Sequence, residues 1–357
     1  MEQSLERHLD QGQWPGVSMI LPVLNEERHL VEAIGALLRQ DYPGPVEVIL
    51  ALGPSTDQTD EVAELLRESD PRVRLVANPS GRTPTGLNLA IAASIHDIVA
   101  RVDGHSVVPS DYLRVAVTTM ERTEADNVGG IMAAEGQTPF QRAVAWAMTS
   151  RLGVGAAAFH VGGSEGPAET VYLGCFRRST LDRVGGYDEA FTRAQDWELN
   201  HRIRAAGGLV WFTPALRVTY RPRSTVRALA LQYLNYGRWR RAVVRTHPET
   251  LRRTSSLRYL APPLTVLGLV AGVSASLGWI AGGSSWLALG SVAPMAYVLL
   301  LVVGSLFGVF QAGLAVGVRL PVVLATMHLS WGAGFIHASV FSRRGRSVPR
   351  HLRRVDL

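Results

Sequence analysis

The sequence predicts an α/β domain with a mostly parallel sheet and helices on both faces, followed by C-terminal transmembrane helices. Apolar runs of strand length alternate with segments of helical spacing from residue 17 onward, which is typical of repeated βα units. Between Arg258 and Arg319, 60 residues follow one another without Asp, Glu, Lys or Arg. Because a spanning helix needs about 20 mostly apolar residues, this run has room for two.

The first strand, VSMILPVL from Val17, is almost wholly apolar and rich in branched residues, as expected for a strand covered on both faces. Further strands are expected at 46–52, 73–76, 97–103, 127–134 and 170–176, and helices at 28–40, 57–68, 84–95 and 195–206. The Gly- and Ala-rich stretch 153–167 is expected to be a loop. Ligands of open α/β sheets bind at the carboxyl ends of the strands, so polar residues there are the first candidates for function.

The hydrophobic end of the chain divides at the Gly-Gly-Ser-Ser sequence 282–285 into expected spans at 260–281 and 286–310. A third segment, 320–341, is less apolar because it contains Pro321 and two histidines. We favour two spans plus an interfacial or re-entrant third helix, with three full spans as the alternative.

Charge divides the chain in the same way. Residues 1–220 hold 19 Arg against 28 acids, whereas 221–258 hold ten Arg against Glu249 alone. Basic residues beside a span are attracted to the anionic cytoplasmic leaflet, and the positive-inside rule assigns that side to the cytosol. The net charge of +6 therefore indicates membrane lipid and no nucleic acid as a partner.

These observations predict a multi-pass protein of the cell membrane whose α/β domain faces the cytoplasm. The expected parts are a cytosolic domain (1–220), a basic amphipathic interface segment (221–258), a membrane domain of two to three helices (259–342) and a basic tail (343–357). The chain contains no Lys, which excludes Schiff-base chemistry and Walker-type phosphate binding. Its lone Cys175 excludes an intrachain disulfide and a zinc cluster.

Asp103-Gly104-His105 follows the fourth predicted strand, where an unpaired buried acid would cost several kcal/mol. A carboxylate and an imidazole two residues apart point to the same side of an extended strand. Together they suit Mn²⁺ better than Mg²⁺, which prefers oxygen ligands. The structural alternative is a turn with an Asp cap.

Gln195-Asp196-Trp197-Glu198 begins a predicted helix. Acids in a first helical turn commonly serve the helix dipole or the N-cap. The functional interpretation is a general base, because a carboxylate beside an aromatic side chain near the mouth of the sheet is placed to take a proton from a sugar hydroxyl.

Five motifs in one order resemble the family 2 inverting glycosyltransferases. They are PVLNEE from Pro22, GPSTD from Gly53, RVDGH from Arg101, GGYDE from Gly185 and QDWE from Gln195. The chain looks most like the membrane-bound succinoglycan-type glucosyltransferases, in which hydrophobic helices also follow the catalytic domain. The resemblance covers about residues 15–245 and implies a GT-A-like fold, that of the nucleotide-diphospho-sugar transferases.

The resemblance also implies roles for individual residues. The catalytic base would be Asp196; the substrate-binding residues would be Pro22, Glu26, Asp57, Asp103, Gln195, Trp197, Glu198, Arg238 and Trp239; and the metal ligands would be Asp103 and His105. Pro22, Glu26 and Asp57 would line the nucleotide pocket, and Asp103 would sit at the DXD-type position that holds a divalent cation. Arg238 and Trp239 resemble the QxxRW element that closes over the donor, with a different spacing.

The sequence also departs from the family pattern. Leu52 stands where an acid usually contacts the base or ribose, and His105 replaces the second acid of the DXD pattern, which favours Mn²⁺. Gln195 replaces the usual Glu beside the base, which is expected to lower the pKa of Asp196 by removing a like charge. Arg101, Arg177 and Arg178 are candidates to neutralise the diphosphate leaving group.

The function that these features predict is inverting transfer of a hexose from a UDP- or GDP-sugar to a polyprenyl-diphosphate-linked glycan, in cell-surface polysaccharide assembly. One alternative is transfer to polyprenyl phosphate, whose oxygen is already anionic and needs no base. The other is a non-catalytic membrane scaffold that binds nucleotide sugars, which Leu52 favours. An oxidoreductase is disfavoured because no G-x-G-x-x-G follows the first strand.

Overall fold

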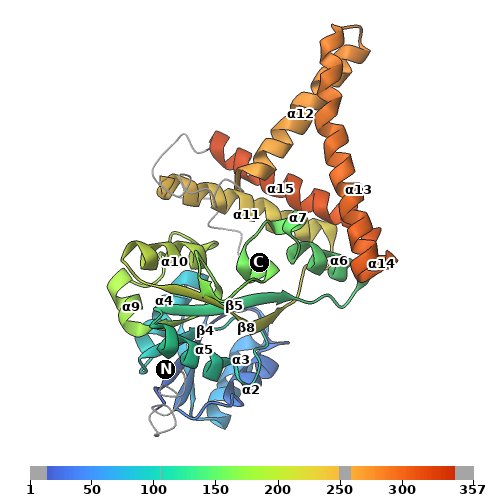
Figure 1. Ribbon diagram of the computed structural model, residues 1–357. Coiled ribbons are helices and arrows are strands. Elements are labelled where there is room, and N and C mark those ends of the chain that lie inside the picture. The colour runs from blue at the N-terminus through green and yellow to red at the C-terminus, as the bar shows by residue number, and fades with distance from the viewer. Residues whose placement is uncertain (1–13, 105, 249–258, 342–357) are drawn as a thin grey trace. The chain divides into compact units, whose positions relative to one another are not determined.

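The computed structural model of the chain describes residues 14–104, 106–248 and 259–341 (Figure 1). It forms two compact units. The first unit contains the chain up to Ala133 together with Ala157–Tyr220, and the second contains Ala134–Ala156 and the residues from Arg221 onward.

The first unit is built on an eight-stranded sheet with the order β3-β2-β1-β4-β7-β5-β8-β6. The strands are β1 (Val17–Val23), β2 (Val46–Leu52), β3 (Val73–Ala77), β4 (Ile98–Arg101), β5 (Asn127–Ala134), β6 (Gly166–Pro167), β7 (Tyr172–Arg177) and β8 (Val210–Tyr220). β3, β2, β1 and β4 run parallel to one another. β7 runs antiparallel to both β4 and β5, and β6 runs antiparallel to β8. The predicted α/β fold class is thus confirmed, as a mixed sheet whose first half is parallel.

Helices pack on both faces of this sheet. They are α2 (Leu30–Leu38), α3 (Thr59–Ser69), α4 (Thr83–Ala93), α5 (Tyr112–Thr123), α8 (Ala158–Val161), α9 (Arg178–Val184) and α10 (Gln195–Ala205). The alternation of side chains along β1 explains the two cores. Met19 and Leu21 pack with the residues of α2 and α5, whereas Ile20 packs with those of α4 and α10. All three β1 side chains are fully buried.

Parts of the first unit were not predicted. They are α5, which buries Tyr112, Leu113, Ala116, Val117 and Met120 at helical spacing, and the 11-residue strand β8, which contains Pro214. The stretch expected to be a loop at 153–167 contains the short helices α7 (Arg151–Val154) and α8, followed by β6. Gly155 and Gly162 end these two helices with φ of 73° and 78°, so the glycines that suggested a loop are helix terminators.

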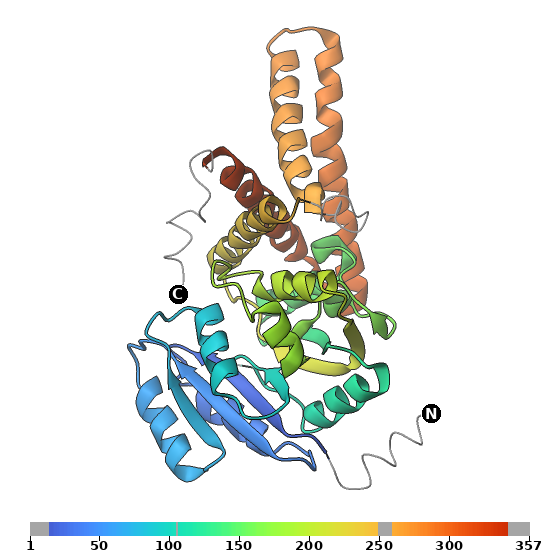
Figure 2. The ribbon, with the colours of Figure 1, turned by 90° about the vertical axis from the view of Figure 1, so that its left-hand side faces the viewer.

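The second unit is helical. Its elements are α6 (Pro139–Met148), α7, α11 (Val226–Thr246), α12 (Ala261–Ile280), the 3-10 helix η3 (Ser285–Ser291), α13 (Val292–Ala312), α14 (Leu314–Gly317) and α15 (Leu320–Phe341). Among the described residues, three segments are long and apolar enough to cross a membrane, namely Ala261–Ile280, Ser285–Ala312 and Leu314–Ala338. Figures 1 and 2 show α12 and α13 side by side as a hairpin, and α15 running beside α11.

The segment Ala134–Ala156 was expected to belong to the cytosolic domain, but it groups with the membrane helices. Trp146 donates its indole N–H to Gln311 Oε1 of α13 at 2.9 Å, and His328 Nε2 of α15 lies 2.8 Å from the carbonyl of Leu152. These polar contacts, with the packing of α6 against α14 and α15, hold the segment in the second unit.

Candidate functional site

The loops after β1 and β2 form the first wall of the site. Asn25 adopts the left-handed conformation, with φ of 55°, and its side-chain oxygen accepts from the backbone N–H of Thr56 at 2.8 Å. The N–H of Glu26 donates to Thr59 Oγ1 at 2.7 Å. Side-chain hydrogen bonds that join both loops hold Glu26 in place, as its predicted position in a nucleotide pocket requires.

Asp57 is part of this cross-linking. Its carboxylate accepts from the Thr59 hydroxyl at 2.5 Å and backbone N–H at 3.1 Å, and from the N–H of Glu27 at 3.3 Å. These hydrogen bonds, the Thr59 hydroxyl first, lower the pKa of Asp57. The structure thus gives Asp57 a part in holding the loops, and its contact with the donor stays a prediction.

The centre of the site is Arg101, the last residue of β4. Its side chain is 4% exposed, its Nη2 lies 3.0 Å from Asp103 Oδ1, and its Nη1 pairs with Asp196 Oδ1. Burial acts against its charge, but the two carboxylates hold the pKa of Arg101 well above its usual range. The predicted cation ligand and the predicted base therefore bind one buried guanidinium.

Asp196 lies in the first turn of α10, and its side chain is 25% exposed. Burial raises its pKa to about 6, Arg101 acts in the opposite direction, and the negative charge of Asp103 raises it further. The lower pKa expected from Gln195 is therefore not the net result, because burial outweighs the loss of a neighbouring acid. A carboxylate with this pKa is ionised at neutral pH and basic enough to accept a proton.

The Gly185-Gly186 turn shapes the wall beside Arg101. Both glycines have positive φ, 78° and 67°, which explains why this turn needs them. Asn88 of α4 accepts from the N–H of Tyr187 and donates to its carbonyl, both at 2.8 Å. The buried Tyr187 ring is thereby held with its centre 5.9 Å from the Arg101 guanidinium carbon.

Sequence reasoning missed Asn88 and its neighbour on α4, Thr85, which donates to the Glu189 carboxylate at 2.8 Å. The available signal was a polar asparagine between the apolar residues Leu87 and Leu89.

Glu198 and Trp197 are partnered within α10. Glu198 is 2% exposed and binds Arg202 through two contacts of 2.7 Å. Arg202 also donates to the carbonyl of Gly186 at 2.8 Å. Trp197 stacks on His201, with ring centres 5.3 Å apart. The structure thus uses Glu198 to support the glycine turn, and the substrate contacts of both residues stay predictions.

Glu26 reaches the end of β4 from the first loop. A Cβ on Gly104 would lie 3.2 Å from Glu26 Cγ, so the Glu26 side chain packs against the residue that directly follows Asp103. His105, the second predicted metal ligand, lies outside the described residues. Within the described residues, no three His, Cys, Asp or Glu side chains gather as a metal site.

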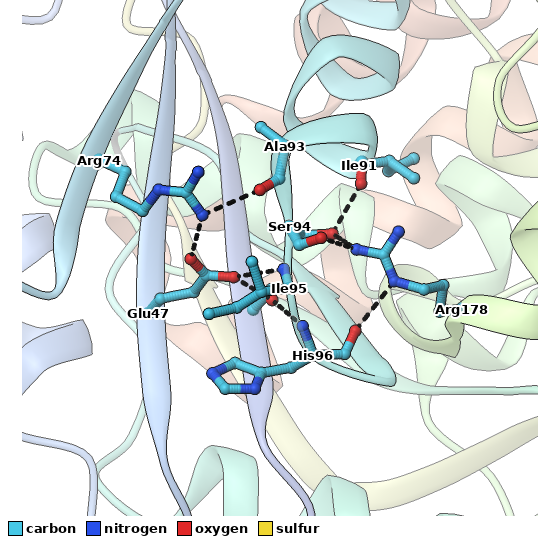
Figure 3. A network of polar contacts seen from close by, with 9 residues as sticks. Glu47, Arg74, Ile91, Ala93, Ser94, Ile95, His96 and Arg178 are labelled. Carbon is cyan, nitrogen blue, oxygen red and sulfur yellow. Dashed lines mark hydrogen bonds and ion pairs between the residues drawn. The ribbon is translucent and has the colours of Figure 1, made fainter.

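Arg177 and Arg178 were expected near the diphosphate, and this is wrong. β7 runs antiparallel to β4, so that Arg177 pairs with Ile98 at the opposite end of β4 from Asp103. Figure 3 shows Arg178 beside the neighbouring network of Glu47 and Arg74, donating to Ser94 and to the carbonyl of His96. Both arginines therefore lie at the edge of the sheet where the parallel strands begin, away from Asp103.

The other residues that were predicted to bind substrate lie on β1, α10 and α11. Pro22 lies near the end of β1 and pairs with Ala51 of β2, and Gln195 opens α10. Arg238 and Trp239 belong to α11 of the second unit, where Trp239 is buried. Their proposed closure over the donor stays a prediction.

Replacing Arg101 with Met should destabilise the protein by about 3–5 kcal/mol, because two partly buried carboxylates would lose their common cation. The loss should shrink as pH falls, since protonation of Asp196 removes the repulsion. Unfolding in detergent, followed at pH 5 and pH 8, measures both effects. The control is Arg67→Met, which removes an ion pair of 2.6 Å whose partners are 48% and 54% exposed and should change stability little. Equal losses for the two variants would contradict the central role of Arg101.

Comparison with known proteins identifies the family of the chain. The family model for glycosyl transferase family 2 matches residues 18–185. The chain is 33% identical to succinoglycan biosynthesis protein ExoA of Rhizobium meliloti over 325 residues, covering 89% of this chain and 93% of that protein. It is 24% identical over 230 residues to a dolichyl N-acetyl-alpha-D-glucosaminyl phosphate 3-beta-D-2,3-diacetamido-2,3-dideoxy-beta-D-glucuronosyltransferase of Methanococcus voltae, covering 62% of this chain and 71% of that protein.

Among solved structures, the mannosyltransferase PcManGT from Pyrobaculum calidifontis, in complex with GDP-Man and Mn²⁺, matches with a TM-score of 0.59 at 18% identity. The match covers 91% of this chain and 93% of that one, and it confirms the expected GT-A-like fold. The family model matches the chain, and the similarity to ExoA extends over most of both chains. The chain therefore belongs to glycosyltransferase family 2.

Proposed function

We propose that this glycosyltransferase moves a hexose from a UDP- or GDP-sugar, with inversion, to a polyprenyl-diphosphate-linked glycan in cell-surface polysaccharide assembly. The observation that carries the proposal is the position of Asp196, a carboxylate of raised pKa held beside Asp103 by Arg101. The similarity over most of both chains to a succinoglycan biosynthesis protein supports a polysaccharide product. The helices suited to a membrane support a lipid-linked acceptor.

Asp196 supplies the base that such a transfer needs. The acceptor hydroxyl gives its proton to the Asp196 carboxylate as its oxygen attacks the anomeric carbon, and the nucleoside diphosphate leaves from the opposite face. Arg101 stays charged throughout and holds the carboxylate in position. One direct displacement inverts the anomeric centre, so that an α-linked donor gives a β-glycoside.

A divalent cation fits the charges beside Asp103. Asp103 and Asp196 against Arg101 leave one net negative charge, and Glu26 approaches the same strand end. Asp103, together with the predicted ligand His105, would hold the cation, which when bound neutralises charge on the diphosphate leaving group. Asp103 and His105 favour Mn²⁺ over Mg²⁺, and the neighbour solved with Mn²⁺ supports a divalent ion.

Transfer to polyprenyl phosphate is the second candidate. The name of the Methanococcus relative contains a dolichyl-linked sugar phosphate, which is consistent with a lipid-phosphate acceptor. Such an acceptor is already anionic and needs no base, so the raised pKa of Asp196 favours the hydroxyl acceptor. A nucleotide-sugar-binding scaffold without catalysis would leave the buried Asp103–Arg101–Asp196 arrangement without a use.

We also propose that the chain crosses the membrane twice, through α12 and α13. α11 carries five arginines and is therefore unsuited to cross. α15 packs backbone to backbone against α11, because a Cβ on Gly334 would lie 2.0 Å from the carbonyl oxygen of Leu234 and one on Gly237 would lie 1.9 Å from that of Trp331. This pairing supports an interfacial α15, with the catalytic domain and the tail both in the cytoplasm.

The first prediction concerns Asp196→Asn, which should reduce transfer at least 100-fold with little effect on donor affinity, since a general base contributes about 10²–10⁴-fold. Purified protein in detergent would be given UDP- and GDP-sugars with a lipid extract and Mn²⁺, Mg²⁺ or chelator, and radiolabel in the lipid fraction would be counted. Asp41→Asn, the same change at an exposed side chain that precedes β2 and lies outside the site, is the control. Unchanged transfer by Asp196→Asn would point to the polyprenyl phosphate acceptor, and donor binding without turnover in wild type would support the scaffold.

The pH dependence tests the same residue. Because the pKa of Asp196 is raised to about 6, the base is lost as pH falls below that value, and kcat/KM should then drop about tenfold per pH unit. An aspartate with the ordinary pKa of 3.8 would keep its activity to near pH 4. Initial rates from pH 4.5 to 8, with unfolding measured in parallel, would follow this limb. A flat profile down to pH 5 would contradict a base whose pKa is raised to about 6.

Cysteine labelling tests the two crossings. The chain's one cysteine, Cys175, is buried and can be replaced by Ala to give a background without thiols. In intact cells, Ser284→Cys between α12 and α13 should react with a membrane-impermeant maleimide, whereas Ser347→Cys should react only after permeabilisation. Reaction of both in intact cells would instead establish three crossings.

A further inference from the structure

The described part of the second unit carries a large excess of positive charge. Its described segments, 134–156, 221–248 and 259–341, contain ten Arg and a single acid, Glu135, which lies 3.4 Å from Arg221. Five of these arginines lie on α11. Helix α11 therefore holds half of the positive charge in the described part of this unit.

Three of the α11 arginines share one face. Arg238, Arg241 and Arg245 are spaced by three and four residues, so they follow one another along one side of the helix. This side faces α15, because the Arg241 guanidinium carbon lies 5.3 Å from the Phe335 ring centre, and a Cβ on Gly334 would lie 3.2 Å from the backbone N of Arg238. Like charges at this spacing repel, so the face favours an anion between them.

Two buried polar atoms lie on this face, one each of Arg238 and Arg241. Arg238 Nε and Arg241 Nε are buried and find no hydrogen-bond acceptor among the residues that the structure describes. Burial, and then the charge of Arg245, lower the pKa of Arg241. A buried guanidinium N–H without an acceptor is destabilising, and a bound oxyanion would supply the missing acceptor.

The position of Arg241 relative to α12 indicates what that oxyanion is. α12, a candidate span, begins at Ala261, and a Cβ on Gly332 of α15 would lie 2.5 Å from the carbonyl oxygen of Pro262. Phe335, which Arg241 covers, is three residues further along α15, a rise of about 4.5 Å. Arg241 is thus close to the level at which the first span starts.

The neighbouring residues agree with this level. The Arg240 guanidinium carbon lies 3.9 Å from the ring centre of Tyr259, just before α12, and tyrosines are enriched at the membrane–water interface. Lipid phosphates lie at that depth. The start of α12 and the arginines of α11 therefore lie at about the depth of the lipid headgroups.

We propose that Arg241 and Arg245 of α11, over Phe335 of α15, bind the phosphate of an anionic membrane phospholipid. The guanidinium groups contact the phosphate oxygens, and the acyl chains lie along the apolar residues of α15 and α12. The bound lipid neutralises the face and holds the α11–α15 pair at the membrane surface. This lipid is distinct from the substrates, and the proposal stands whether or not the acceptor is polyprenyl-linked.

Thermal unfolding of the full chain in neutral detergent tests this site. Phosphatidylglycerol, phosphatidylcholine or inorganic phosphate would be titrated separately, and the rise of the unfolding midpoint with concentration gives the affinity of each. Phosphatidylglycerol should raise the midpoint saturably, and the other two should not. Arg241→Gln should weaken the phosphatidylglycerol affinity about tenfold, as expected for the loss of a charged hydrogen bond.

Arg227→Gln is the matched control, because it removes the same charge from an exposed position near the start of the same helix and should keep the wild-type affinity. If Arg241→Gln does not fold, Arg245→Gln, an exposed position, serves in its place and should also weaken binding. Equal affinities for wild type and Arg241→Gln would overturn the proposal. So would an equal response to phosphatidylcholine, a response to inorganic phosphate that indicates a soluble anion, or tighter binding of polyprenyl phosphate, which would assign the site to an acceptor.

Discussion

The catalytic unit depends on one buried cation. Arg101 ends a parallel strand with its side chain 4% exposed, and burying it is tolerable only because Asp103 and Asp196 approach from β4 and α10. The same contacts set the chemistry. They place the two acidic side chains on one guanidinium, and burial of Asp196 raises its pKa to about 6 against the pull of that guanidinium. The stability of the site and its proposed function therefore rest on a single arrangement of charge.

How far the sequence predicts the fold depends on the kind of strand. The parallel strands β1, β2 and β4 are buried on both faces and read as continuous apolar runs, so their positions were predicted closely. β8 alternates buried and exposed residues and contains Pro214, a weaker signal. The direction of β7 depends on a long-range pairing that no local pattern contains, which is why Arg177 was expected at the wrong edge.

The candidate site shows a similar division. Asp103, Asp196 and Glu26 lie at strand or helix ends, where an acid has no packing role, and a single sequence is enough to indicate them. The residues that hold them in place are harder to predict. Asn88 and Arg202 use their side chains on backbone atoms of the Gly185-Gly186 turn, and a side chain that binds a distant backbone leaves no motif in the sequence.

In the candidate membrane helices, hydropathy indicates which segments are able to cross a membrane, and the packing against neighbouring helices bears on whether they do. By length and composition alone, Leu314–Ala338 is as able to cross a membrane as Ala261–Ile280. The two segments differ in the helices that they contact. Gly334 of α15 packs against the arginine-bearing helix α11, whereas α12 packs against apolar helices. A helix packed backbone to backbone against five arginines can enter the hydrocarbon only if those charges enter with it, at about 2.5–3.5 kcal/mol each. The neighbouring helix, more than its own residues, thus determines where α15 lies.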